Sequence, residues 1–212
     1  MIRQALTMAL MVVFCTVGAF AASEKRLMKD FRDGKTYKTV QIGSQIWMAE
    51  NLNYNTGESF CYDNEEFNCA KYGRLYTWKA VQKVCPVGWH LPRVEEFERL
   101  IETVGGILEE DEYRLDDYYS GAGEKLKSTS GWKEYKGKKG NGDDAFGFSA
   151  LPAGYRHSNE HYYHEGTTAY FWSSTETSDY IAYYMSLFNG DGKAELEYNF
   201  KDYGYSVRCV KD

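Results

Sequence analysis

A cysteine and a histidine lie five residues apart in the segment KVCPVGWHLPR, residues 83–93. Cys85 and His90 suggest three chemistries: a reactive thiol with a histidine base, a metal site, or one end of a disulfide. Nucleophilic catalysis needs a third group that orients the base, and this segment supplies none. We favour a disulfide, because a free thiol is disfavoured in an oxidising compartment that holds further cysteines.

The N-terminus predicts such a compartment. Arg3 precedes an apolar run over residues 5–20, and Ala19-Phe20-Ala21 has the small-x-small pattern of a secretory cleavage site. The run is short for a membrane span, although an uncleaved anchor helix is the alternative. We therefore expect a signal peptide over residues 1–21, with no membrane span after its cleavage.

Export leads us to expect an extracellular, cell-surface or periplasmic protein. Residues 22–29 are interpreted as a short N-terminal segment and residues 30–212 as one domain, since the chain has no linker and no repeat of fixed period. Four cysteines remain after cleavage, namely Cys61, Cys69, Cys85 and Cys209. An even number predicts two disulfides, and the sequence leaves all three pairings open.

Three histidines lie within the segment RHSNEHYYHEG. On a helix, His157, His161 and His164 would share one face and could bind zinc. The flanking glycines and the SNE turn favour a hairpin or loop, in which His161 and His164 point to opposite faces. We favour the surface interpretation and keep a weak metal site as the alternative.

Asparagine and aspartate cluster at two glycine-containing loops. Asn141, Asp143 and Asp144 offer oxygen ligands for calcium, as do Asn189 and Asp191. Neither segment matches an EF-hand loop, and the same residues are typical of turns. No cofactor is therefore predicted, with calcium as the lesser alternative.

Acidic residues outnumber basic ones, at 31 to 25, which argues against a nucleic-acid partner. Nineteen tyrosines stand out, because tyrosine joins a large apolar ring to a polar tip that suits surfaces binding sugars or proteins. Packing in an aromatic-rich core is the alternative. The candidate ligand-binding residues are Tyr155, Tyr162, Tyr163, Tyr170, Tyr183 and Tyr184.

The elements expected to position these residues form an α+β fold with mainly antiparallel strands. A hairpin is predicted over TYKTVQI and QIWMA, residues 36–49, and an Asn-rich loop over residues 53–73. One principal helix is predicted over residues 93–104, with apolar residues on one face and Gly105 after it. A shorter helix is expected before Pro86. The predicted C-terminal strands are AYFWSST, IAYYMSLF, KAELEYNF and YSVRCV.

Seven phrases together resemble one family of exported bacterial proteins, the Fibrobacter major paralogous domain. In chain order they are YKTVQIGSQIWMAENL, YGRLYTW, CPVGWHLP, LKSTSGW, GFSALPAGYR, FWSSTE and YSVRCVKD. The resemblance runs from about residue 30 to the C-terminus. One departure is Arg93 after HLP, where such proteins often have a Thr or Ser that caps the next helix.

The resemblance implies a fold but no activity. GYR, FWSST and VRCV are also similar to phrases of the formylglycine-generating-enzyme superfamily, which implies a C-type-lectin-like fold with disulfide staples. By likeness to lectin-like domains, Cys85 would pair with Cys209, leaving Cys61 to pair with Cys69. The copper-using oxidases of that superfamily need two reactive cysteines near the domain end, where this chain has Cys209 alone.

These observations together predict an exported, non-enzymatic module that binds a glycan or a cell-envelope protein. A structural or adhesion component of a cell-surface assembly is the first alternative. A metal-dependent enzyme at the histidines, or a degenerate member of the superfamily, is the second.

Overall fold

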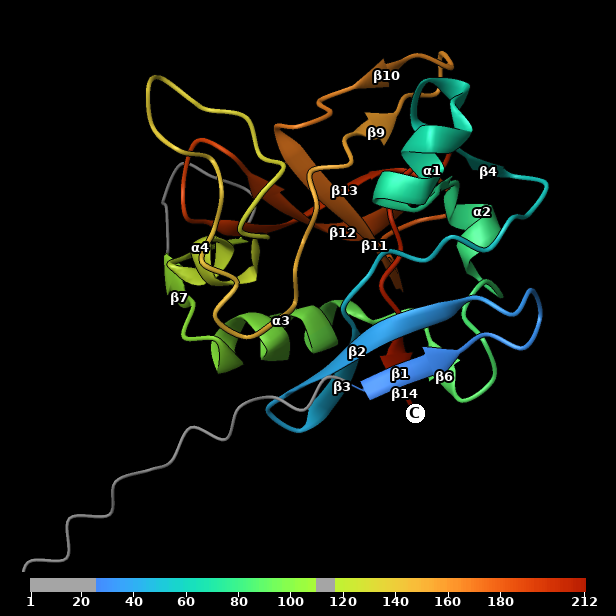
Figure 1. Cartoon of the computed structure of the whole chain (residues 1–212), viewed down its shortest axis with the longest axis horizontal. Helices are drawn as coiled ribbons and strands as arrows, with labels where there is room; N and C mark the ends of the chain where they lie inside the picture. Colours follow the sequence, from blue (N-terminus) through green and yellow to red (C-terminus); the bar gives the residue numbers. More distant parts are fainter. Residues whose placement is uncertain (1–25, 110–116) are drawn as a thin grey trace, which may run out of the picture.

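Two five-stranded sheets form the framework of the chain, for which this computed structural model describes residues 26–109 and 117–212. The first sheet has the order β1-β2-β3-β14-β6 and lies at the bottom of Figure 1. Its strands are β1 (Arg26–Lys29), β2 (Thr36–Ile42), β3 (Gln45–Met48), β14 (Val210–Lys211) and β6 (Trp89–His90). The predicted hairpin corresponds to β2 and β3, whose pairing matches Thr39 with Met48.

The second sheet has the order β11-β12-β13-β8-β7. Its strands are β11 (Thr168–Glu176), β12 (Ile181–Phe188), β13 (Ala194–Phe200), β8 (Asp117–Ser120) and β7 (Ile107–Glu109). Every ladder between neighbouring strands of the two sheets is antiparallel. Short helices lie against these sheets, and the described chain is therefore an α+β protein.

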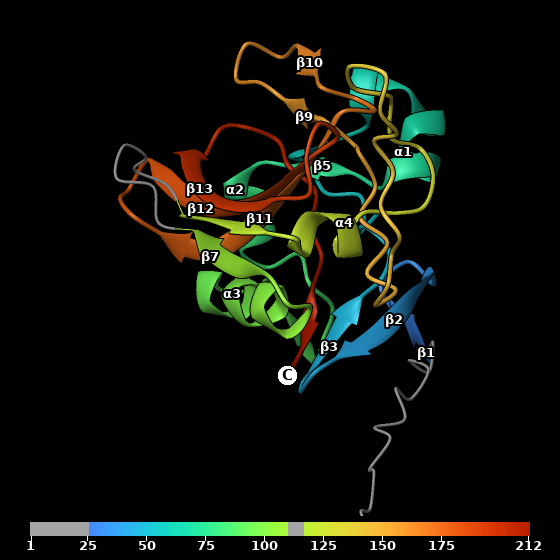
Figure 2. The ribbon, with the colours of Figure 1, turned by 90° about the vertical axis from the view of Figure 1, so that its left-hand side faces the viewer.

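The second sheet separates two hydrophobic cores. Because neighbouring side chains of a strand point to opposite faces, Met185 and Leu187 of β12 enter one core, while Ala182 and Tyr184 enter the other. Helix α3 (Val94–Thr103) covers the first face, and the hairpin of β9 (Tyr155–Arg156) and β10 (Tyr162–Tyr163) lies beyond the second (Figure 2).

Helix α3 is the principal helix that the sequence predicts. Phe97, Leu100 and Ile101 are fully buried on its apolar face, and the Phe97 ring stacks on Trp47 with centroids 5.4 Å apart. Each such side chain stabilises the fold by about 1.5–3 kcal/mol through burial. The helix therefore joins the first sheet to the second.

The start of α3 uses partners other than the usual hydroxyl at the capping position. The Glu96 carboxylate accepts the Arg93 backbone N–H at 2.9 Å, and Thr175 of β11 accepts the Val94 N–H through Oγ1 at 3.0 Å. Together they satisfy N–H groups that the helix cannot satisfy itself. The hydroxyl missing at residue 93 is thus replaced by one from another strand.

The predicted Asn-rich loop is more structured than the sequence indicated. Residues 53–73 contain β4 (Ser59–Phe60), the 3₁₀ turn η1 (Tyr62–Asn64) and helix α1 (Glu66–Tyr72). Cys69 and Tyr72, three residues apart, form the buried face of α1. Two buried residues are too few to reveal a helical periodicity in the sequence, and the polar residues around them favoured a loop.

Two further short helices and one strand complete the described elements. These are β5 (Leu75–Tyr76), which pairs with β4, α2 (Trp78–Val81) and α4 (Ala122–Leu126). The predicted short helix before Pro86 corresponds to α2, which is capped by the Thr77 side chain. None of the helices in the described chain is long and apolar enough to cross a membrane.

The last predicted strand, YSVRCV, is wrong except at its end. Only Val210 of this run belongs to β14, while residues 205–209 cross from one sheet to the other and bond to a different partner at almost every step. Tyr205 pairs with Tyr76, and the Cys209 carbonyl accepts the Met48 N–H. The local composition favours a strand, but these residues bond to several different segments, so they form no continuous ladder with one neighbouring strand.

At the N-terminal end, the predicted signal peptide lies outside the described residues. Strand β1 falls within the segment interpreted as a short N-terminal extension, yet it pairs with β2 along its whole length. The structural unit therefore includes residues from Arg26 onward.

Candidate functional site

Cys85 and His90, the pair that first suggested chemistry, have separate partners. Cys85 is bonded to Cys209, and Cys61 is bonded to Cys69. These are the two pairs that the resemblance implied. All four cysteines of the described chain are thus in disulfides, so Cys85 has no thiol for His90 to activate.

His90 lies between two carboxylates. Its Nδ1 is 2.7 Å from Asp212 Oδ1, and its Nε2 is 3.0 Å from both Glu96 oxygens. Burial by itself lowers the pKa of His90, but the hydrogen bonds to Asp212 and Glu96 outweigh it and raise the pKa above its ordinary value. His90 thus ties the C-terminus to the beginning of α3.

The three other histidines lie on the β9–β10 hairpin, as the glycines around them indicated. The His157 N–H donates to the His161 carbonyl, which closes the hairpin turn. His157 Nδ1 accepts the Asn159 N–H, and His164 Nδ1 lies 3.0 Å from the Tyr170 hydroxyl. No metal-ligating group of three or more side chains in the described residues contains a histidine. The group that does meet, Cys61, Glu66 and Cys69, has both sulfurs in a disulfide.

The oxygen atoms of the candidate calcium residues make turns within the chain. Asn141 Oδ1 accepts the Trp132 N–H, and Asp143 Oδ1 accepts the Ala145 N–H. Asp144 accepts both the N–H and the hydroxyl of Ser149. These hydrogen bonds are of the kind found in turns, the interpretation favoured over calcium in the sequence analysis.

Four of the six candidate tyrosines, Tyr155, Tyr163, Tyr170 and Tyr184, belong to one aromatic cluster. Tyr155 lies at its centre and makes ring contacts with Tyr163, Tyr170, Tyr203, Tyr205, His157 and His164 at centroid distances of 5.3–6.4 Å. Burial raises the pKa of the Tyr155 and Tyr170 hydroxyls, so both stay protonated at neutral pH. Tyr163 and His164 form the exposed edge of the cluster.

Tyr162 and Tyr183 lie outside the cluster, and Tyr184 lies at its buried end. Tyr162 shares the opposite face of the hairpin with Arg156. Tyr183 points to the face of the second sheet that carries Tyr198, while Tyr184 is only 7 % exposed and donates its hydroxyl to Glu197 at 2.6 Å. Adjacent residues of a strand cannot share a face, so including Tyr184 in an exposed surface was wrong.

An open cavity of about 620 Å³, here called the hairpin groove, runs between the β9–β10 hairpin and the segment of η1 and α1. Its lining residues are Tyr62, Asp63, Asn68, Lys133, Tyr162, Tyr163, His164, Glu165 and Thr167. In Figure 1 the hairpin and α1 lie side by side at the top. The Cys61–Cys69 disulfide holds the η1–α1 wall together.

Aromatic contacts join the two walls of the groove. The Tyr62 and Tyr162 rings lie 5.3 Å apart, and the Tyr162 hydroxyl donates to Asn64 Oδ1 at 2.7 Å. Gly154, at φ +65°, passes so close that an added Cβ would lie 2.3 Å from the Tyr163 carbonyl oxygen. Only glycine fits there, and the groove is thus fixed by its backbone as well as by its side chains.

Glu165 is the best-bonded polar group of the groove. Its carboxylate accepts hydrogen bonds from the Tyr72 hydroxyl and from Lys133 Nζ, and Lys71 Nζ lies 3.6 Å away. Burial raises the pKa of Glu165, but these donors outweigh it and hold the pKa below its ordinary value. The groove thus presents a fixed carboxylate beside aromatic rings.

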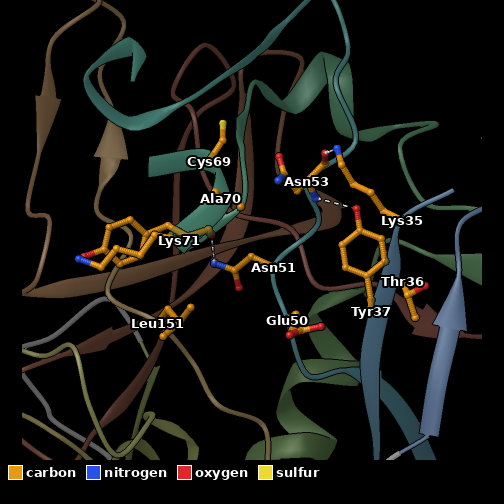
Figure 3. Close-up of a pocket in the computed structure, with 12 residues that line it drawn as sticks. Lys35, Thr36, Tyr37, Glu50, Asn51, Asn53, Cys69, Ala70, Lys71 and Leu151 are labelled. Carbon is orange, nitrogen blue, oxygen red and sulfur yellow. Dashed lines mark hydrogen bonds between the residues drawn. The ribbon is translucent and has the colours of Figure 1, made fainter. Parts of the chain in front are cut away.

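A second cavity, of about 260 Å³, lies between β2, the segment 50–53 and the end of α1 (Figure 3). Its polar groups bond mainly to one another. The Tyr37 hydroxyl accepts the Asn53 N–H at 3.0 Å, and Asn51 Nδ2 donates to the Tyr72 carbonyl at 2.7 Å. Lys35 Nζ donates to the Asn53 carbonyl. This cavity is smaller than the hairpin groove, and its tyrosines Tyr37 and Tyr72 are buried whereas Tyr163 of the groove is exposed, so the hairpin groove is the better candidate.

Comparison with known protein families decides the relationship. The family model described as the Fibrobacter succinogenes major domain matches residues 40–211. The chain belongs to this family. No curated protein and no solved structure matched it. The match begins within β2 and ends at Lys211, so it leaves out β1, the residues before β2 and the first part of β2.

For this Fibrobacter major domain, sequence reasoning found the hairpin but missed the opposite wall of its groove. Tyr62, Asp63 and Asn68 lie in the segment predicted as a loop, and Lys133 follows a tryptophan in a run of glycines and lysines. The two cysteines that flank Tyr62 and Asn68 were the available signal, since a short disulfide loop holds its residues in one place.

Proposed function

We propose that this Fibrobacter major domain is an exported, non-enzymatic module that binds a glycan in the hairpin groove. The proposal includes a C-type-lectin-like fold, in which a principal helix is clamped to the closing strand. The Cys85–Cys209 disulfide, which ties the segment before α3 to the residue before β14, supports this part.

The observation that carries the glycan proposal is the meeting of aromatic and polar groups in one open groove. Sugars offer an apolar face that stacks on rings and hydroxyls that need hydrogen-bond partners. Tyr163, 38 % exposed, supplies a ring at the rim, and Glu165, Asn68 and Asp63 supply polar partners. The proposed localisation follows from the predicted signal peptide together with the two disulfides.

A binding role is favoured over the enzymatic alternatives by the state of the reactive groups. Cys85 and Cys209 are bonded to each other, and His90 is held between two carboxylates. The hairpin histidines contact tyrosine rings and backbone groups. These contacts occupy the groups that the enzymatic alternatives would use, which supports a binding role.

A second candidate function is a structural role in a cell-surface assembly, and it is supported by an aromatic surface away from the groove. Tyr180, Tyr198 and Phe200 are exposed on the second sheet, and the Tyr198 ring meets Tyr183 edge-on at 6.0 Å. Exposed aromatic patches of this kind are typical of protein contacts. Capture of envelope proteins that is lost in Phe200→Ala and kept in Tyr163→Ala would favour this second function.

The glycan proposal is tested by screening the secreted chain against a panel of neutral hexasaccharides of β-1,4-linked glucose, xylose or mannose. Binding to at least one is expected, with loss in Tyr163→Ala and retention in Tyr180→Ala. Tyr180 is the matched control, because it is 74 % exposed and lies outside the groove. Absence of binding to every probe, or equal loss in both variants, would overturn the proposal.

A further inference from the structure

A smaller cavity of about 240 Å³ opens where the two Asn/Asp loops of the sequence meet. Its lining includes Lys127, Lys138 and Lys139, the carboxylates of Glu124 and Asp191, and the amides of Asn141 and Asn189. We call it the lysine pocket. Three ammonium groups against two carboxylates give it a positive balance, in a chain whose net charge is −6.

Lys127 is the unusual member of the lysine pocket. It is only 3 % exposed, and its Nζ donates to the carbonyls of Phe188 at 2.9 Å and Asp191 at 2.7 Å. No carboxylate within the described residues forms an ion pair with it, and burial lowers its pKa. The charges of Asp191 and Glu124 raise the pKa of Lys127 in part, but neither forms an ion pair with it. A bound anion would further offset the cost of burying this ammonium.

Lys138 and Lys139 add two exposed ammonium groups at the mouth of the pocket. Neither forms an ion pair with a described residue. Lys136, two residues before Lys138, is just as exposed but lies outside the lining and places its Nζ over the Tyr135 ring at 5.1 Å. The chain thus offers a matched residue of the same charge beside the pocket.

Asn189 supplies a second, independent sign of a ligand. It is 4 % exposed, and its Nδ2 donates to the Lys133 carbonyl at 2.9 Å. Its Oδ1 is buried and receives no hydrogen bond from any described residue. Such an oxygen needs a donor, which a bare inorganic anion such as sulfate cannot supply and a hydroxyl can.

We infer that the lysine pocket binds the carboxylate of a sugar acid. Lys127, Lys138 and Lys139 neutralise the carboxylate, and a hydroxyl of the same sugar donates to Asn189 Oδ1. The inference rests on the proposed glycan function and adds to the hairpin groove a second subsite for an acidic sugar. Asn189 also links the two sites, because its N–H donates to the Thr167 carbonyl and both Thr167 and Lys133 line the hairpin groove.

The test is a calorimetric titration of the full secreted chain with galacturonate, galactose and sodium sulfate at constant ionic strength. Galacturonate is expected to bind at least about tenfold more tightly than galactose or sulfate, since a charge-assisted hydrogen bond is worth about one decade or more. Equal affinity for galactose, or equal or tighter binding of sulfate, would overturn the assignment to a sugar acid.

Variants separate the pocket from general charge effects. Lys138→Ala/Lys139→Ala is expected to weaken galacturonate binding about tenfold or more, while the control Lys83→Ala/Lys136→Ala, of equal charge, leaves it unchanged. Equal weakening in both double variants would overturn the site. All four side chains are exposed, so folding is preserved.

The same titrations keep the inference and the proposed function apart. Tyr163→Ala is expected to keep its affinity for galacturonate, because Tyr163 does not line the lysine pocket. Binding of neutral hexasaccharides without binding of galacturonate would overturn the lysine pocket alone. Binding of galacturonate without binding of any hexasaccharide would overturn the hairpin groove alone.

Discussion

His90 shows how a residue with an apparent catalytic neighbour can serve another purpose. It lies between Glu96 of α3 and Asp212 at the C-terminus, and Arg93 Nε is 3.9 Å from the same Glu96. With a carboxylate at each ring nitrogen, the doubly protonated imidazolium is favoured, which raises its pKa. The contact stabilises the fold when His90 is charged.

This raised pKa makes stability depend on pH. The contribution of His90 is complete below its unfolded pKa of 6.5 and is lost as the pH rises through the raised folded value. We expect the free energy of unfolding to fall between about pH 6 and pH 9 by less than about 1 kcal/mol, since His90 is 38 % exposed and screened. Urea titrations should show this fall, which His90→Gln removes and the exposed control His161→Gln retains. The same fall in His90→Gln would contradict the assignment.

Individual residues set the limit of sequence reasoning for the site. Tyr155, Tyr163 and Tyr170 lie together as the tyrosine-rich segment suggested. Tyr183 and Tyr184 are neighbours in sequence but point to opposite faces, and which face is covered depends on α3 and the hairpin. The sequence alone therefore did not predict that Tyr184 is buried and that Tyr183 is not.

At the scale of elements, α3 begins with help from β11. Thr175 Oγ1 accepts the Val94 N–H, and this bond takes the place of a local cap. We expect Thr175→Ala to lower the free energy of unfolding by about 1 kcal/mol, the usual cost of losing a capping hydroxyl. Chemical denaturation measures this cost, and Thr177→Ala, an exposed threonine two residues on, serves as the control. Equal stability of both variants would show that the cap contributes nothing.

The two disulfides differ in what they stabilise. Cys85–Cys209 closes a separation of 124 residues and Cys61–Cys69 one of 8. In the loop-entropy description their removal costs about 5 and about 2.5 kcal/mol respectively. We expect Cys85→Ala/Cys209→Ala to be the less stable double variant in urea. Cys61→Ala/Cys69→Ala should keep more of the folding stability but should weaken glycan binding, because this disulfide holds the η1–α1 wall of the groove. Equal losses of stability would contradict this division.

Elements with a strong repeating pattern were predictable, and those set by distant partners were not. The strand IAYYMSLF corresponds to β12 residue for residue, and the principal helix differs from α3 only at its ends. The run 205–209 was predicted as a strand, because its apolar composition does not reveal that Arg208 is fully buried. Its guanidinium donates to the carbonyls of Met48 and Phe148. Such a buried charge depends on contacts that are distant in sequence.

At the scale of the whole molecule, the second sheet separates the face covered by α3 from the face that carries the proposed binding groove. Helix α3 and the first sheet cover one face, and the β9–β10 hairpin with its groove lies beyond the other (Figure 2). The hairpin is fixed to the body by Tyr155, whose ring stacks on Tyr203 at 5.8 Å. The groove is therefore attached to the body of the chain by packed aromatic rings, which supports the proposal of a preformed binding site.

The central claim is that the hairpin groove binds glycan through the exposed Tyr163 ring. The most direct measurement is the dissociation constant of the bound neutral hexasaccharide for the wild type, Tyr163→Phe, Tyr163→Ala and Tyr180→Ala. The account predicts nearly unchanged binding for Tyr163→Phe and Tyr180→Ala, and about tenfold weaker binding for Tyr163→Ala, from the loss of ring stacking. Unchanged binding by a folded Tyr163→Ala variant would contradict it.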